Sequence, residues 1–257
     1  MPIHPTAIID PQASIADDTV VGAYAIIEGP VTIAPGCWIG PHVVIRGPAS
    51  IGAGTRIFQF ASIGEEPQDK KFSGEASRLE IGTDNTIREG VTINRGTAEG
   101  GGVTQIGDRN WIMAYVHIAH DCILGNDGVF ANGTSLAGHV CVGNAVTLGG
   151  FTLVHQFCQI GEGCFTSMGS CIRQDVPPWV MVSGDPGEPH GINIEGLKRR
   201  GFDSEARQRV RSAYKMLYRE GRSLRDAIQA IEALSAADPV LSSMTDFLRT
   251  SSRGIVR

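Results

Sequence analysis

An apolar residue, usually isoleucine, valine or leucine, recurs at every sixth position along most of this chain. One series runs in a single phase from Ile3 to Ile93, with a longer interval after Ile63. A second series, displaced by one residue, runs from Ile106 to Ile172 and is interrupted only by a threonine. A period of six matches neither an α-helix, with a period of 3.6, nor a strand, with a period of 2. The repeat therefore belongs to a larger unit that turns a corner every six residues.

The period of six predicts a mainly β protein, a parallel β-helix. Each hexad forms one short flat face, and three hexads close a triangular coil of about 18 residues with the apolar side chain inside. Glycine often follows the apolar residue, as at Gly22, Gly40 and Gly161, which suits a tight turn. A sandwich of short strands is the alternative, but its turns would not recur at one fixed interval over such a length.

The repeat ends after Asp175, in a segment rich in proline and glycine, and helical spacing begins near Ile192. We expect a hexapeptide-repeat β-helix over residues 1–188 and a C-terminal α-helical domain over residues 189–257. Ser204 and Ser223 stand where helix N-caps are expected. Segments 65–77 and 97–104 interrupt the repeat; the first either replaces a coil or projects from one, and such loops are commonly functional.

Composition and charge narrow the function further. The chain has no apolar run long enough to cross a bilayer and no signal peptide at its N-terminus, so we expect a soluble cytoplasmic protein. The six cysteines lack CxxC spacing and are interpreted as reduced packing residues. Residues 189–257 hold 13 of the 22 basic residues but 8 of the 27 acidic ones. A basic tail beside an acidic β-helix indicates an anionic ligand or an acidic partner, or simply a solvated helix face.

The candidate chemistry lies in a cluster of polar residues within the second series. Its members are His117, His120, Asp121, His139, His155 and Gln156. One coil added to His120 gives Gly138, and two coils give Gln156, so these positions are expected to stack on one edge. Histidine is a natural general base at neutral pH, Asp121 could orient it at a corner, and the Gly138 backbone N–H could stabilise an oxyanion.

Two other interpretations apply to the same histidines. His117, His120 and His139 could supply three ligands to a zinc ion shared across a trimer interface. Alternatively, each histidine could form only surface hydrogen bonds. The clustering of the residues favours a functional site over isolated surface positions.

Six segments resemble the UDP-N-acetylglucosamine O-acyltransferase family. They are TINRGT (92–97), AYVHIAHDC (114–122), LAGHV (136–140), LVHQFC (153–158), QDVPP (174–178) and NIEGLKRRGF (193–202). The resemblance spans essentially the whole chain. It implies a left-handed β-helix and a homotrimer with active sites between adjacent subunits. The implied reaction transfers a 3-hydroxyacyl group from acyl carrier protein to the glucosamine 3-hydroxyl of UDP-N-acetylglucosamine, the first step of lipid A synthesis.

The resemblance also implies roles for individual residues. His120 would be the general base, with Asp121 and Gly138 as its catalytic partners and with no metal, cofactor or covalent enzyme intermediate. The residues that would hold the two substrates are Asp69, Lys71, His117, His139, His155, Gln156, Asn193, Glu195, Arg199 and Arg200. No nucleic acid partner and no stable membrane insertion are expected.

Two positions depart from features seen in the family. Asn94 stands where many members have histidine in TIHRGT; asparagine can donate and accept hydrogen bonds but cannot carry charge. Met168 lies near the far end of the implied acyl groove, where some relatives have glycine and accept longer chains. We interpret Met168 as a ruler that favours short acyl chains; a packing role is the alternative.

Two other functions are compatible with parts of the pattern. A zinc-dependent trimeric β-helix hydratase of the carbonic anhydrase type would use the same histidines, and stoichiometric zinc would favour it. A non-enzymatic scaffold is the third interpretation, but it leaves NIEGLKRRG and the loop at 65–77 unexplained.

Overall fold

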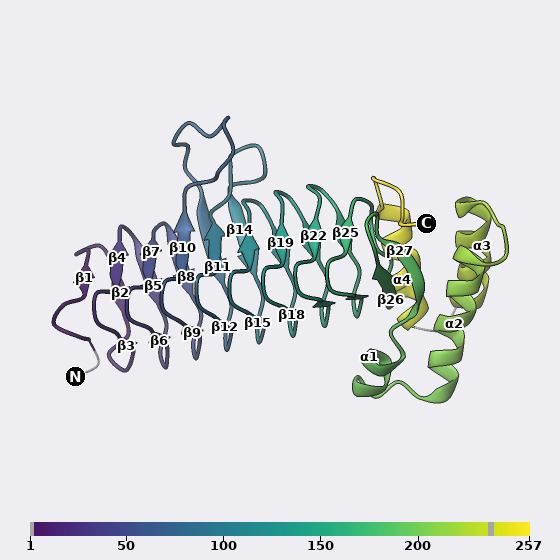
Figure 1. The fold of residues 1–257 in the computed structure, drawn as a ribbon, viewed down its shortest axis with the longest axis horizontal. Coiled ribbons are helices and arrows are strands. Elements are labelled where there is room, and N and C mark those ends of the chain that lie inside the picture. Colours follow the sequence, from purple (N-terminus) through teal and green to yellow (C-terminus); the bar gives the residue numbers. More distant parts are fainter. Residues whose placement is uncertain (1–2, 236–238) are drawn as a thin grey trace.

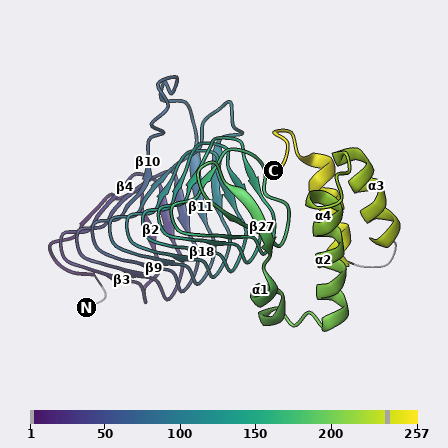
Figure 2. The same ribbon diagram turned by 45° about the vertical axis from the view of Figure 1, so that its right-hand side comes forward.

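The computed structural model describes residues 3–235 and 239–257. Short parallel strands stack into a long triangular prism, and the helices gather at its C-terminal end (Figure 1). Figure 2 shows the successive coils lying one behind another, with the N-terminal coil and the helices at opposite ends of the prism. The left-handed parallel β-helix with a C-terminal helical part, predicted from the sequence, is confirmed.

Three sheets form the faces of the prism. Face 1 contains β1 (Ile8–Ile9), β4 (Ile26–Glu28), β7 (Val44–Arg46), β10 (Ser62–Glu65), β13 (Thr92–Asn94), β16 (His117–Ile118), β19 (Ser135–Leu136), β22 (Leu153–Val154) and β25 (Cys171–Ile172). Face 2 contains β2 (Ser14–Ile15), β5 (Val31–Ile33), β8 (Ala49–Ile51), β11 (Arg78–Ile81), β14 (Val103–Ile106), β17 (Ile123–Leu124), β20 (Cys141–Val142) and β23 (Gln159–Ile160). Face 3 contains β3 (Val20–Val21), β6 (Trp38–Ile39), β9 (Arg56–Ile57), β12 (Thr86–Ile87), β15 (Trp111–Ile112), β18 (Val129–Phe130), β21 (Thr147–Leu148), β24 (Phe165–Thr166), β26 (Val180–Ser183) and β27 (Glu188–Ile192).

The apolar residue of each hexad forms the core. Ile27, Ile45 and Ile63 stack on one another along face 1, and each is buried. Complete burial of such a side chain stabilises the fold by roughly 1.5–3 kcal/mol. Thr166, the polar member of the series, is also buried, and its hydroxyl lies 2.8 Å from that of Thr152. The period of six therefore identifies the interior of the prism.

The two interrupting segments leave the prism as loops, which project from the same edge (Figure 1). Ile81 pairs with Ile51 on face 2 and not with Ile63, which lies on face 1. Segment 65–77 therefore projects between one face and the next and does not replace a coil. The two loops meet, because Lys71 Nζ lies 3.6 Å from Glu99 Oε2.

Strand structure continues beyond Asp175, in the segment rich in proline and glycine where the six-residue repeat ends. β26 adds a parallel strand to β24, and β27 folds back antiparallel on β26. The prolines lie outside the residues of β26, so they remove none of its backbone donors. The predicted domain division at 188/189 falls at the start of β27 and stays a prediction.

The C-terminal part contains α1 (Ile194–Arg199), α2 (Ser204–Tyr218), α3 (Leu224–Ser235) and α4 (Pro239–Thr250). The N-cap of α2 is Asp203, whose carboxylate accepts the Ala206 N–H, so the prediction of Ser204 is wrong by one residue. The predicted cap Ser223 is confirmed by its bond to the Asp226 N–H. No helix within the described residues has the length and apolarity that a membrane span requires.

Candidate active site

The predicted histidine cluster lies where the chain turns from face 1 to face 2. Because β16 pairs with β19 as His117 opposite Ser135, His120 and Gly138 occupy equivalent positions in successive coils. A Cβ atom added to Gly138 would lie 2.6 Å from His120 Cε1, so glycine is required for the imidazole to occupy this place. The stacking predicted from the coil length is confirmed.

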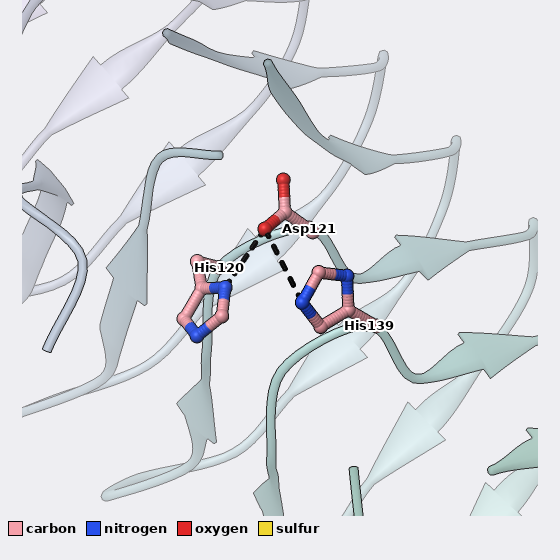
Figure 3. A group of neighbouring side chains, drawn as sticks. All are labelled: His120, Asp121 and His139. Atoms are coloured by element: carbon pink, nitrogen blue, oxygen red, sulfur yellow. Dashed lines mark hydrogen bonds and ion pairs between the residues drawn. The ribbon is translucent and has the colours of Figure 1, made fainter. Parts of the chain in front are cut away.

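His120 and Asp121 point toward one another although they are neighbours in the chain (Figure 3). Asp121 has a left-handed backbone, with φ of 59°, and this corner lets the two side chains converge. His120 Nδ1 lies 2.8 Å from Asp121 Oδ2. The aspartate side chain is only 1% exposed and that of His120 14%. An ionised Asp121 accepts a hydrogen bond from Nδ1–H, which leaves the Nε2 lone pair of His120 free to accept a proton.

The loop of residues 97–104, which is rich in glycine, also contacts the Asp121 carboxylate. The Thr97 backbone N–H donates to Asp121 Oδ1 over 2.8 Å, and the Thr97 hydroxyl donates to Oδ2 over 2.6 Å. These donors satisfy the charge of a carboxylate that water does not reach.

Two further histidines border the pair. His139 Nε2 lies 3.8 Å from Asp121 Oδ2, and the His139 ring stacks on Phe157 with 4.4 Å between centroids. Burial lowers the pKa of His139, while the Asp121 charge opposes that shift. His117 Nδ1 lies 2.7 Å from Thr92 Oγ1, and burial, followed by the nearby His120, lowers the pKa of His117. Both shifts favour neutral imidazoles.

Three possible metal ligands come together within one chain, and they differ from the three histidines expected to be shared across a trimer interface. Within residues 3–235 and 239–257, the atoms close enough together belong to His120, Asp121 and His139. His117 is absent from this group, and its Nδ1 is engaged by Thr92. Asp121 Oδ2 already accepts from Thr97 and His120, which together occupy both of its lone pairs. The geometry therefore fits an oriented base better than a metal centre.

A groove of about 460 Å³ crosses face 1 beside His117. Leu153, His155 and Cys171 line it, and Arg173 lies at its C-terminal end. Its lining is largely apolar, which suits a hydrocarbon chain.

A second pocket, of about 300 Å³, joins α1 to face 3 and gathers Asn193, Glu195, Arg199 and Arg200. The Asn193 amide oxygen accepts the Gly196 N–H and its nitrogen donates to the Gly163 carbonyl, both over 2.8 Å. Asn193 thereby caps α1 and anchors it to the prism. The arginines bring positive charge to the pocket, as an anionic ligand requires.

Comparison with known proteins decides the family. The family model described as UDP-N-acetylglucosamine O-acyltransferase, domain 2, matches residues 175–256, and the bacterial transferase hexapeptide model matches residues 104–138. The acyl-[acyl-carrier-protein]–UDP-N-acetylglucosamine O-acyltransferase of Thiobacillus denitrificans is 57% identical over 99% of both chains. The chain belongs to the UDP-N-acetylglucosamine O-acyltransferase family. The corresponding enzyme of Alkalilimnicola ehrlichii is 56% identical over 99% of both chains, and the crystal structure of the Moraxella catarrhalis enzyme superposes with a TM-score of 0.98, at 43% identity over 100% of both chains.

The structure of this acyltransferase brings many of the predicted residues to one edge. His117, His120, Asp121, Gly138 and His139 lie around the same corner. His155 and Gln156 follow one coil later and are exposed, with His155 Nδ1 3.1 Å from the Gln156 carbonyl oxygen. Asp69, on the projecting loop, lies close enough for its charge to act on His139, and Lys71 of the same loop pairs with Glu99. Their assignment to substrate binding stays a prediction.

Other predicted residues of the acyltransferase lie elsewhere in the chain. Asn193, Glu195, Arg199 and Arg200 border face 3, whereas His120 lies at the corner of faces 1 and 2. Met168 is 79% exposed at the corner that joins face 3 to face 1, and it does not line the groove. Within one chain, the residues at α1, Met168 and the His120 corner therefore do not form one site.

Sequence reasoning did not find every residue that shapes the site. Thr97, Thr104 and Gly100 surround Asp121, whereas the sequence marks segment 97–104 only as an interruption of the repeat. Asn94 is buried, and its amide nitrogen donates to the Glu66 carbonyl over 2.7 Å, so it anchors the base of the projecting loop. A histidine at this position could make the same contact through a ring N–H.

Proposed function

We propose that this acyltransferase moves a 3-hydroxyacyl group from acyl carrier protein to the glucosamine 3-hydroxyl of UDP-N-acetylglucosamine, the first step of lipid A synthesis. The observation that carries the proposal is the His120–Asp121 pair, 2.8 Å apart, beneath Gly138. The names of the relatives described above support both substrates.

The chemistry follows from the two ring nitrogens of His120. Nδ1 donates to Asp121, and Nε2 takes the proton of the sugar 3-hydroxyl as its oxygen attacks the thioester carbonyl. The Gly138 N–H, which has no acceptor among the described residues, donates to the oxyanion that forms. Collapse of this intermediate expels the carrier thiolate, which receives the proton from His120. No metal, cofactor or covalent enzyme intermediate takes part.

Each pocket suits one part of the substrates. The groove over face 1 would hold the acyl chain, and the pocket at α1 would hold the uridine and phosphates through Asn193, Glu195, Arg199 and Arg200. Met168 does not line the groove within one chain, so it would act as the ruler only from a neighbouring subunit. The remaining contacts to sugar and acyl group come from Asp69, Lys71, His117, His139, His155 and Gln156.

The two pockets meet if the enzyme is a homotrimer. Exposed rings form a row along the corner between faces 3 and 1: Tyr24, His42, Phe60, Tyr115 and Phe151. Tyr24 stacks on His42 and His42 on Phe60, with centroids 5.2 Å and 5.4 Å apart. If this row lies at a threefold axis, face 3 of one subunit faces face 1 of the next. The nucleotide pocket then stands opposite the acyl groove of the neighbouring subunit.

Charge supports acyl carrier protein, an acidic partner, as the donor. Residues 189–257 carry 13 of the 22 basic residues and 8 of the 27 acidic ones, and these helices stand beside the prism. Attraction between these basic helices and the acidic carrier protein raises their association rate at low salt. At limiting carrier protein, acyl transfer should therefore slow as salt is added. A cytoplasmic location, expected from the sequence, is part of this proposal.

The test is acyl transfer by the purified protein from a chain-length panel of 3-hydroxyacyl carrier proteins to UDP-N-acetylglucosamine and its 3-amino analogue. We expect transfer, and we expect His120→Ala to lower kcat by about 10²–10⁴-fold, while the exposed His4→Ala changes it little. Asp121→Asn should also lower kcat. Absence of transfer from every donor to either acceptor, or full activity of His120→Ala, would contradict the proposal.

A further inference from the structure

The loop formed by residues 97–104 folds back onto the corner and encloses Asp121. On the basis of the proposed function, we infer that Thr97 is a positioning residue for the His120–Asp121 pair. It clamps both carboxylate oxygens of Asp121, through its backbone N–H at 2.8 Å and its hydroxyl at 2.6 Å. Thr97 touches neither substrate nor His120 in the proposed reaction and acts through the aspartate.

The contacts define the orientation of the carboxylate. Two donors from one residue, one on each oxygen, fix the plane of the carboxylate, and the second lone pair of Oδ2 then faces His120 Nδ1. The backbone is fixed as well, because the Asp121 N–H donates to Thr104 Oγ1 over 2.8 Å. A general base must be held within a few tenths of an ångström of its productive position, so such support affects turnover.

The loop itself is shaped for this contact. The Gly102 N–H donates to the Thr97 carbonyl over 2.7 Å, and the Gly100 N–H donates to that carbonyl over 3.1 Å. A Cβ atom at Gly100 would lie 2.0 Å from Asp121 Cγ. The glycine therefore allows the loop backbone to close directly over a carboxylate that is almost fully buried.

Replacement of the hydroxyl tests the inference. Thr97→Val keeps the shape and the backbone N–H but removes the donor to Oδ2, and we expect kcat to fall by about tenfold to a hundredfold. KM for both substrates should stay within about twofold, since the loss affects the base and not the substrate contacts. Thr97→Ser should restore most of the turnover. The matched control is Thr55→Val, which removes another buried hydroxyl, bonded to the Gly82 carbonyl over 3.1 Å, and should leave kcat nearly unchanged.

Wild-type kcat in Thr97→Val, or equal loss in the serine variant, would overturn the inference. If Thr97→Val does not fold, Gly100→Ala is the second test. The added methyl group would displace the Asp121 carboxylate, while the Thr97 hydroxyl remains. Unchanged kcat in Gly100→Ala would also overturn the inference.

Proton NMR of protein labelled with ¹⁵N-histidine separates this inference from the proposed function. We expect a downfield His120 Nδ1–H resonance, assigned by its absence from His120→Ala, that Thr97→Val shifts or removes and Thr97→Ser keeps. This signal reports on the pair even if no acyl transfer occurs. A wild-type signal in Thr97→Val would show that the threonine does not position His120.

Discussion

Arg200, at the C-cap of α1, forms an ion pair with Asp127 at a corner of the prism, with 3.2 Å between Nη2 and Oδ2. Asp127 also binds Arg109, over 2.8 Å between Oδ1 and Nε. Hydrogen bonding from Arg109, supported by Arg200, lowers the pKa of Asp127, which is therefore a carboxylate at neutral pH. This pair joins the helical part to the prism at the pocket proposed for the nucleotide.

The first prediction concerns Arg200, the arginine at the C-cap of α1 that pairs with Asp127. Arg200→Ala should raise KM for UDP-N-acetylglucosamine by about tenfold, because a charged donor to phosphate is lost, and should leave kcat within about twofold. Steady-state kinetics with the sugar nucleotide varied measures both. Arg249→Ala, which removes an arginine on α4 paired with Glu232, is the control. Unchanged KM in Arg200→Ala would exclude Arg200 from nucleotide binding.

The second prediction concerns the exposed aromatic row. Tyr115 is 74% exposed in this row, and Tyr115→Glu would place three carboxylates near the proposed threefold axis. We expect the variant to sediment as smaller species and to lose at least about tenfold in activity, because each site as proposed needs two subunits. Ile123→Glu, an exposed apolar residue on face 2, should stay trimeric. A wild-type protein that sediments as a monomer yet transfers acyl groups would contradict the arrangement.

The third prediction concerns acyl length. If Met168 limits the chain, Met168→Gly should shift the preferred donor toward longer chains by several carbons, as seen by competition between donors of different length. The wild type should favour short chains. Equal activity of the wild type on long and short donors would contradict the ruler hypothesis. A packing role would then need a contact with a neighbouring subunit, because Met168 is 79% exposed within one chain.

The fourth prediction concerns the pH dependence of stability. Burial lowers the pKa of His117 below its ordinary value of 6.5, so the unfolded chain binds a proton that the folded protein resists. The contribution of neutral His117 to the free energy of unfolding is fully present above about pH 6.5. It is lost as the pH falls toward the pKa of His117 in the folded protein. Urea unfolding at about pH 7.5 and about pH 5.5 should show a smaller loss in His117→Gln than in the wild type. The exposed His4→Gln should lose as much as the wild type.

Most of the fold could be predicted because one rule repeats. Every sixth residue points inward, so Ile27 and Ile45 in the core, and His120 beneath Gly138, follow from counting. The contact of Thr97 with Asp121 could not be predicted, because the path of a loop outside the repeat leaves no periodic trace. The N-cap of α2 was missed by one residue because Asp203 and Ser204 both suit that position.

The coil step has a consequence for how such a site can change. His120 and Gly138 are separated by one rung of the backbone ladder, whose spacing of about 4.8 Å is common to all β-sheets. The backbone distance between His120 and the oxyanion donor is therefore a property of peptide hydrogen bonding, whereas Asp121 and Thr97 orient the imidazole ring itself. A site on this scaffold can therefore move along the prism only by whole coils. The loops around it can take any length.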